Sequence, residues 1–223
     1  MGTTNINNNV AVSVSDAFRV HLISVLGLAS AIWIAHNIYT INLTTHPIQA
    51  LRLILVFETP ILISLYSCLG RNREQCSYLV AVGRGMLGLL AGAVFMVLGA
   101  VTLGAPVGIQ YMKKTIYWSL LMSSFTFVPT SCVFGSSWMD WQRLFANTKP
   151  IGVVDYMICI PAHGAVIGAW LGAWPMPLDW ERPWQEWPVC VSYGALAGYL
   201  VGVFASWGVL LVFGKRENHF KGD

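Results

Sequence analysis

The sequence predicts an all-α membrane protein, a bundle of six transmembrane helices, and composition and segment length support this prediction. Of the 223 residues, 56% are hydrophobic and only 10% are charged, and the mean hydropathy is +0.60. These values lie far outside the range of soluble domains. Six apolar segments are each long enough to cross the hydrocarbon core of a bilayer. We therefore expect residues 1–223 to form a single transmembrane domain.

The six apolar segments are separated by short polar connections. They cover residues 18–41, 48–69, 79–103, 115–135, 151–174 and 188–213. Residues 1–17 are mostly polar and rich in asparagine, which predicts a disordered lead. Residues 214–223 form a short polar tail. So little chain lies outside the apolar segments that we expect no soluble domain.

Lysine and arginine are distributed unequally between the two predicted faces of the membrane. With six spans both termini lie on one face, and that face carries Arg19, Arg71, Arg73, Arg143, Lys149, Lys215, Arg216 and Lys221. The opposite face carries Lys113, Lys114 and Arg182, while Arg52 and Arg84 lie inside spans. Short cytoplasmic loops are enriched in lysine and arginine, so we expect both termini in the cytosol. The net charge of +3 follows mostly from this bias, so we expect no nucleic-acid partner.

Glycines recur at a spacing of four in the last two segments, which places each set on one helical face. They are Gly164, Gly168, Gly172, Gly194, Gly198 and Gly202. The third segment repeats the spacing at Gly88 and Gly92. Helices associate in lipid through small residues that let backbones approach closely. Packing within the bundle explains any one face, but three faces leave room for one to receive a helix of a partner.

The connection between the last two segments, residues 175–188, is dense in proline and tryptophan and reads PMPLDWERPWQEWP. Asp179 is placed to cap a short helix that starts at Trp180. On that helix Trp180, Trp184 and Trp187 recur at i, i+4 and i+7, which predicts one aromatic face. Such a face is typical of the aromatic belt at the membrane interface. The adjacent Asp, Glu, Arg and Gln side chains also suit a protein-docking surface, and both interpretations stay open.

Glu58 and His163 are ionisable residues near the middle of their spans, where a charge costs roughly 2.5–3.5 kcal/mol. Each is close to a proline that frees backbone groups, Pro60 or Pro161. We expect the two side chains to approach each other. They would then form either an interhelical polar lock or a proton-relay or ligand site. Arg84 and Asp155 lie about one turn inside a span, where we expect them to extend towards the interface.

The sequence contains no recognisable catalytic constellation. It has no nucleophile with a neighbouring base, no glycine-rich phosphate loop after a strand and no metal-ligand spacing. Its five cysteines are scattered, so we expect no zinc site or disulfide framework, and no metal or cofactor. Two functions that would use the buried ionisable residues stay open. They are an intramembrane lipid-modifying transferase and a small transporter, each using Glu58 and His163.

The C-terminal third resembles the Pig-F family of glycosylphosphatidylinositol (GPI) anchor assembly. The resemblance rests on the glycine-rich run 163–174, the loop 175–188 and the run 194–202, together with chain length and number of spans. It implies a non-catalytic subunit of the endoplasmic reticulum membrane. Its partners would be large catalytic ethanolamine-phosphate transferases, of the Pig-O and Pig-G types, and membrane lipid.

With such a partner in view, we expect the glycine faces and the loop described above to make the contact. In the spans the contact residues are the six glycines of the last two segments. In the loop they are Pro177, Asp179, Trp180, Arg182, Pro183, Trp184, Gln185 and Trp187.

Overall fold

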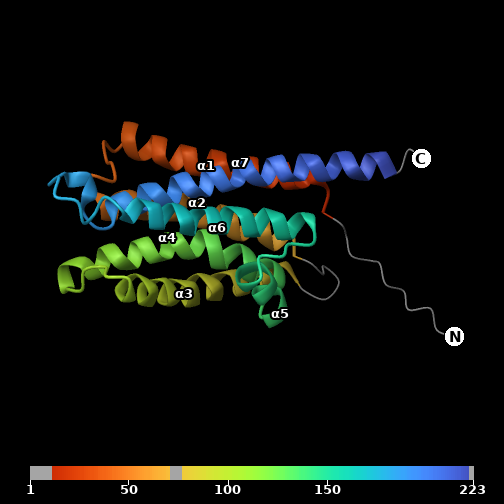
Figure 1. Cartoon of the computed structure of the whole chain (residues 1–223), viewed down its shortest axis with the longest axis horizontal. Helices are drawn as coiled ribbons and strands as arrows, with labels where there is room; N and C mark the ends of the chain where they lie inside the picture. Colours follow the sequence, from red (N-terminus) through yellow and green to blue (C-terminus); the bar gives the residue numbers. More distant parts are fainter. Residues whose placement is uncertain (1–11, 71–76, 221–223) are drawn as a thin grey trace.

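The computed structural model describes residues 12–70 and 77–220, with side chains up to residue 212, and these ranges contain helices but no strands. Six helices are long and apolar enough to cross a membrane (Figure 1). They are α1 (Val14–Asn37), α2 (Pro47–Cys68), α3 (Tyr78–Thr102), α4 (Ile109–Phe134), α6 (Val153–Ala173) and α7 (Val189–Phe220). The prediction of an all-α bundle with six spans is confirmed.

Several helix ends differ from the predicted boundaries. Helix α1 begins at Val14, inside the predicted disordered lead, because the Ser13 hydroxyl caps it by accepting a hydrogen bond from Ser15 N at 3.1 Å. Residues 1–11 of that lead lie outside the described residues. Helix α4 begins at Ile109, six residues before the predicted start. Helix α7 continues to Phe220, so most of the predicted tail is helical, and residues 221–223 lie outside the described range.

A short helical segment that hydropathy did not predict connects α4 to α6. It consists of α5 (Trp138–Trp141) and a π-helical turn (Gln142–Ala146). Arg143 of this turn forms an ion pair with Asp155 at the start of α6, 3.1 Å apart. Asp155 also accepts a hydrogen bond from Ile151 N at 3.0 Å. Asp155 is therefore buried and paired, and the expectation that it extends towards the interface was wrong, because a cation from the connecting segment reaches it.

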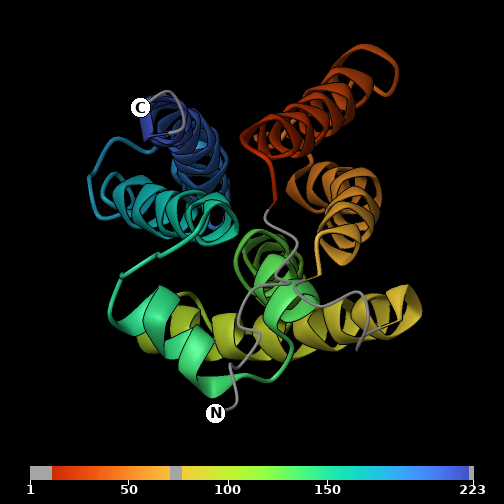
Figure 2. The ribbon, with the colours of Figure 1, turned by 90° about the vertical axis from the view of Figure 1, so that its right-hand side faces the viewer.

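Helix α4 occupies the centre of the bundle (Figure 2). In its most apolar stretch of 18 residues, 78% of the residues are buried, against 28–39% in the corresponding stretches of the other five spans. It also has the lowest mean hydropathy of the six spans and is rich in serine and threonine. Ser124 and Thr126 donate to carbonyls one turn back, Leu121 O and Met122 O, both at 2.7 Å. Because their hydroxyls are satisfied within the helix, this polar helix can lie inside a membrane bundle.

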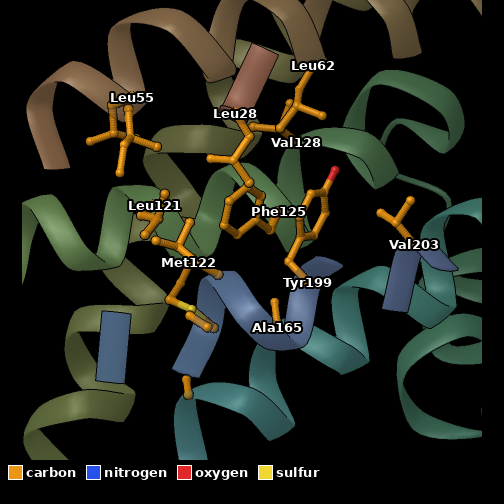
Figure 3. Packing of buried hydrophobic residues seen from close by; sticks show 14 of the residues in the cluster. Leu28, Leu55, Leu62, Leu121, Met122, Phe125, Val128, Ala165, Tyr199 and Val203 are labelled. Atoms are coloured by element: carbon orange, nitrogen blue, oxygen red, sulfur yellow. The ribbon is translucent and has the colours of Figure 1, made fainter. Parts of the chain in front are cut away.

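The core between α4 and its neighbours is built from interlocking apolar side chains (Figure 3). Phe125 of α4 stacks on Tyr199 of α7 with ring centroids 4.1 Å apart. Leu28 of α1 and Leu62 of α2 pack beside this pair. Four helices therefore meet at one buried aromatic contact.

The ends of the bundle are distinct. Both described ends of the chain lie at one end, here called the terminal end (Figure 1). The α1–α2, α3–α4 and α6–α7 connections lie at the other, here called the loop end (Figure 1). The tryptophan-rich connection 175–188 is therefore on the side opposite to the termini.

Candidate functional site

The glycine faces of α6 and α7 pack directly against each other. A Cβ atom added at Gly198 would lie 2.8 Å from Cα of Gly168, and one added at Gly202 would lie 2.7 Å from Cα of Pro161. Real Cβ atoms essentially never come within 3.0 Å of other heavy atoms. The two backbones are therefore in contact along the shared face, and residues larger than glycine do not fit there.

The glycines of the last two spans therefore contact each other and not a partner. This contradicts the prediction that Gly164, Gly168, Gly172, Gly194, Gly198 and Gly202 bind a partner, because two antiparallel helices with the same spacing fill each other's grooves. The face on α3 is also filled. Gly88 and Gly92 receive side chains of α4, among them Ser131 and Phe127. None of these three faces is open to another chain.

One buried side chain, Gln185, organises the tryptophan-rich loop. Its Nε2 donates to Pro175 O at 2.6 Å and to Leu178 O at 2.9 Å. Its Oε1 accepts from Arg182 N at 2.9 Å. Gln185 thus joins the start, the middle and the end of the loop, so this polar side chain has a structural role and does not face a partner.

Trp187 also points into the protein. Its indole nitrogen donates to Thr115 Oγ1 of α4 at 3.0 Å, and its ring packs on Trp118 with centroids 5.1 Å apart. The prediction of one aromatic face shared by three tryptophans was therefore wrong. The helix that would align them does not form, because Glu181 has a positive φ of 48° and only the short 3-10 turn Pro183–Gln185 follows.

Trp180 and Trp184 lie on the outer surface of the loop. Their ring centroids are 6.0 Å apart, and they are 56% and 36% exposed. The side chains around them are also exposed, namely Pro177, Leu178, Asp179, Glu181, Arg182 and Pro183. The loop therefore has an inner side that anchors it and an outer side, here called the outer tryptophan surface, that combines two indoles with charges of both signs.

Glu58 and His163 do not form the expected hydrogen bond. His163 Nδ1 bonds to Cys159 O, one turn back in its own helix, at 2.7 Å, and the ring stacks on Phe145. Glu58 bonds to Ser24 instead. Both residues are at mid-helix as predicted, but the rotation of α6 turns His163 towards the π-helical segment.

The carboxyl of Glu58 lies in a buried hydrogen-bond chain. Its Oε1 accepts from Ser24 Oγ at 2.6 Å, and Ser24 Oγ is 2.9 Å from Tyr199 Oη. The serine hydroxyl has one hydrogen and donates it to Glu58, so Tyr199 is the donor to Ser24. The chain joins α7, α1 and α2 across the bundle, and none of its members is more than 2% exposed.

A second set of buried contacts converges on the carbonyl of Met157. Pro161 has no N–H, so the Met157 carbonyl lacks its usual helical donor four residues on. His21 Nε2 of α1 lies 3.2 Å from this oxygen, and Tyr66 Oη of α2 donates to it at 3.5 Å. The proline in α6 thus supplies an acceptor that ties α1 and α2 to α6.

The hydrogen-bond chain of Glu58 and the contacts at the Met157 carbonyl are here together called the polar core. Sequence reasoning missed four of its members, namely His21, Ser24, Tyr66 and Tyr199. Pro161 was a usable signal, since a proline at i+4 identifies a carbonyl that needs another donor. Nothing in the sequence indicated which residues would supply it. Within residues 12–70 and 77–220, no group of three His, Cys, Asp or Glu side chains is arranged to hold a metal ion. The polar core consists of hydrogen bonds that link α1, α2, α6 and α7.

Comparison with known proteins identifies the family. The model of the "GPI biosynthesis protein family Pig-F" matches residues 25–207, which is most of the chain. The chain belongs to this family. The matched region runs from α1 to α7 and includes the outer tryptophan surface and the paired glycine faces.

Individual relatives of this Pig-F family member match over shorter segments. Proteins of Mus musculus and Homo sapiens, each named "GPI ethanolamine phosphate transferase, stabilizing subunit", are 39% identical over 103 residues, which is 46% of this chain and 47% of each relative. A "PIGF/3-ketodihydrosphingosine reductase fusion protein" of Schizosaccharomyces pombe is 39% identical over 118 residues, 50% of this chain and 23% of that protein. The matches thus span about half the length of the mouse and human relatives. No solved structure matches the chain.

Proposed function

We propose that this Pig-F family member is a non-catalytic stabilising subunit of an ethanolamine phosphate transferase that acts in GPI-anchor synthesis in the endoplasmic reticulum membrane. The names of the mouse and human relatives support this role. The partners would be the large catalytic subunits of the Pig-O and Pig-G types. The buried polar core supports it too, because its groups are used to join helices and lie out of reach of a substrate.

The observation that carries the proposal is the outer tryptophan surface. Tryptophan and arginine dominate the energetics of protein interfaces, and this surface presents Trp180, Trp184 and Arg182 together. Gln185 and Trp187 hold the loop in place from inside, so little ordering entropy is lost when a partner docks. A loop that only anchored the protein at the headgroup level would not need this internal bracing.

The charge distribution supports placing this surface in the lumen. Most of the lysine and arginine of the short connections belong to segments that the sequence assigns to the face of the termini, which favours the cytosol for that face. The loop end, with the outer tryptophan surface, then faces the lumen. A contact with a catalytic domain on that side needs this orientation.

Contact within the membrane would use surfaces other than the glycine faces. Helix α3 is the least buried span, and Leu87, Leu90, Val94 and Leu98 are each about 60–70% exposed along one side of it. This strip is continuous and apolar, so it can meet either lipid or a helix of the catalytic subunit. We assign the lumenal loop the main share of partner recognition.

The proposal is tested by replacing Trp184 and Arg182 with alanine in the tagged chain and measuring how much catalytic subunit co-purifies. We expect a loss of about tenfold or more, since a tryptophan or arginine at the centre of an interface contributes about 2 kcal/mol or more. The abundance of the chain in the membrane should stay within about twofold, because both side chains are exposed and a surface substitution has little effect on folding.

The matched control is Trp138→Ala, which removes an indole that is 75% exposed at the terminal end of the bundle. This variant should retain its partner. Equal loss of partner binding and membrane abundance in the loop variant would show that the loop serves membrane anchoring instead of docking.

A further inference from the structure

A groove lies between α2 and α3, with α4 as its floor. Both helices pack against α4 more extensively than against each other, so they diverge and leave a space of about 550 Å³. The lining is almost entirely apolar and includes Leu55, Ile63 and Leu89. A volume of this size is within the range of pockets that bind small molecules.

The groove runs along the membrane normal and is open on its outer side. On α2 its lining extends from Arg52 to Ser64, which is about 18 Å at a rise of 1.5 Å per residue. On α3 the lining extends from Tyr78 to Leu89, in the half of that helix that begins at the terminal end, so the groove crosses the middle of the bilayer. Val56 and Met86 on its rim are 64% and 48% exposed, so the space is accessible from the lipid.

The cross-section of the groove suits a single lipid chain. A volume of 550 Å³ over about 18 Å corresponds to a mean area of about 30 Å². A helix with its side chains is at least about 10 Å across and needs roughly 80 Å². The space therefore encloses a single acyl chain, which has no side chains to accommodate, whereas a whole helix could only rest against its open side.

Two cations lie at the loop end of this groove. Arg52 lines it, and Lys113 lies one turn before Tyr117, which also lines it, on the same face of α4. Among the described residues neither cation has a hydrogen bond or an ion pair, whereas the adjacent Lys114 is paired with Glu186 at 3.6 Å. Because α2 and α4 both begin at the loop end, their side chains lean towards it and bring the two charges to headgroup level.

The middle of the groove contains a polar group without a partner. Thr59 is only 7% exposed, lines the groove, and its Oγ1 has no hydrogen-bond partner in the described part of the chain. The next residue is Pro60, which deprives the Val56 carbonyl of its helical donor. The Oγ1 atom itself is enclosed by its neighbours, so this hydroxyl belongs to the wall of the groove and does not face a ligand.

We propose that this groove binds a membrane phospholipid. One acyl chain lies along α4 between α2 and α3, and Arg52 and Lys113 bind the phosphate at the loop end. The headgroup is then at the loop end, the same end as the outer tryptophan surface. This assignment is independent of the transferase role, since the purified chain alone should show it.

The proposal is tested with a phosphatidylethanolamine that carries a photoactivatable diazirine in one acyl chain. The probe is added to the purified full chain in mild detergent, and labelled peptides are identified by mass spectrometry. We expect labelling to concentrate on the groove-facing residues of α2 and α3. Met86→Trp should fill the groove and reduce this labelling about tenfold, the effect of removing one good contact. Val94→Trp, on the exposed side of the same helix, should not change it.

The role of the cations is tested with the double variant Arg52→Ala, Lys113→Ala. Labelling by the phospholipid should fall about tenfold, as expected for the loss of charge-assisted hydrogen bonds. Labelling by a diacylglycerol with the same diazirine chain but no phosphate should be unchanged. The control double variant Arg19→Ala, Lys149→Ala removes two exposed cations at the terminal end and should have no effect.

Two results would overturn the proposal. One is labelling spread evenly over the outer faces of the bundle and insensitive to Met86→Trp, which would mean annular lipid only. The other is protection of the groove by a peptide of a partner protein. If Met86→Trp fails to fold, Met86→Phe provides a gentler variant, since it adds less volume to the groove and should still lower phospholipid labelling while the protein remains monodisperse.

Discussion

At the scale of single residues, the buried polar groups of this protein are used as links between helices. Ser24 accepts from Tyr199 and donates to Glu58, so one hydroxyl joins three helices. The position of Glu58 at mid-span predicted that it would need a partner, and it has one. The identity of that partner was wrong because the sequence does not reveal how each helix is rotated about its axis. A hydrogen bond between helices depends on that rotation as much as on depth.

Replacing Ser24 with alanine should destabilise the purified chain. It leaves Glu58 Oε1 and Tyr199 Oη without their partners, at a cost of about 1–3 kcal/mol. For a chain of this length that corresponds to a fall in Tm of several degrees, at about 2–4 °C per kcal/mol. Thermal unfolding in detergent, followed by size-exclusion chromatography, measures the shift.

Ser30→Ala is the matched control for this variant. Ser30 lies on the same helix, but it is exposed and its hydroxyl bonds only to Gly27 O within α1, at 2.8 Å. Its Tm should stay within about a degree of the wild type, as for a neutral surface substitution. An unchanged Tm for Ser24→Ala would show that the hydrogen bonds from Tyr199 through Ser24 to Glu58 contribute nothing to the stability of the protein.

At the scale of helices and loops, hydropathy alone predicted all six spans, because each must be apolar over the thickness of the bilayer. It did not predict α5 and the π-helical turn, which are short and contain no glycine or proline signal. The spacing of the glycines predicted close packing correctly. It could not show that α6 and α7 would pack on each other, since a glycine face fits any neighbour with a similar face.

Replacing Gly198 with alanine should destabilise the protein itself and not only a complex. The new Cβ would meet the backbone of α6, and such overpacking typically costs about 1–3 kcal/mol. The thermal stability of the chain without any partner measures this effect. Gly208→Ala is the control on the same helix, because a Cβ there meets nothing within 4 Å. It should be neutral or slightly stabilising.

A Gly198→Ala chain that is as stable as the wild type but no longer binds its partner would contradict this account and support the earlier prediction that this face binds a partner.

At the scale of the whole molecule, the bundle surrounds one polar helix and presents two different ends. The sequence assigns most of the lysine and arginine of the short connections to the predicted face of the termini. The loop end carries the outer tryptophan surface and the two cations Arg52 and Lys113. Sequence reasoning could find the loop from its composition, but not its division into inner and outer sides. That division depends on Thr115 of α4, which is 72 residues away from Trp187 in the chain.

The most direct test of the accessory role is to identify by mass spectrometry the proteins that co-purify with the tagged chain from gently solubilised microsomes. Recovery of a large ethanolamine phosphate transferase in comparable amount is the predicted result. The Trp184→Ala, Arg182→Ala chain should lose it, while Trp138→Ala should keep it. Recovery of the wild-type chain alone, folded and monodisperse, would contradict the role of stabilising subunit.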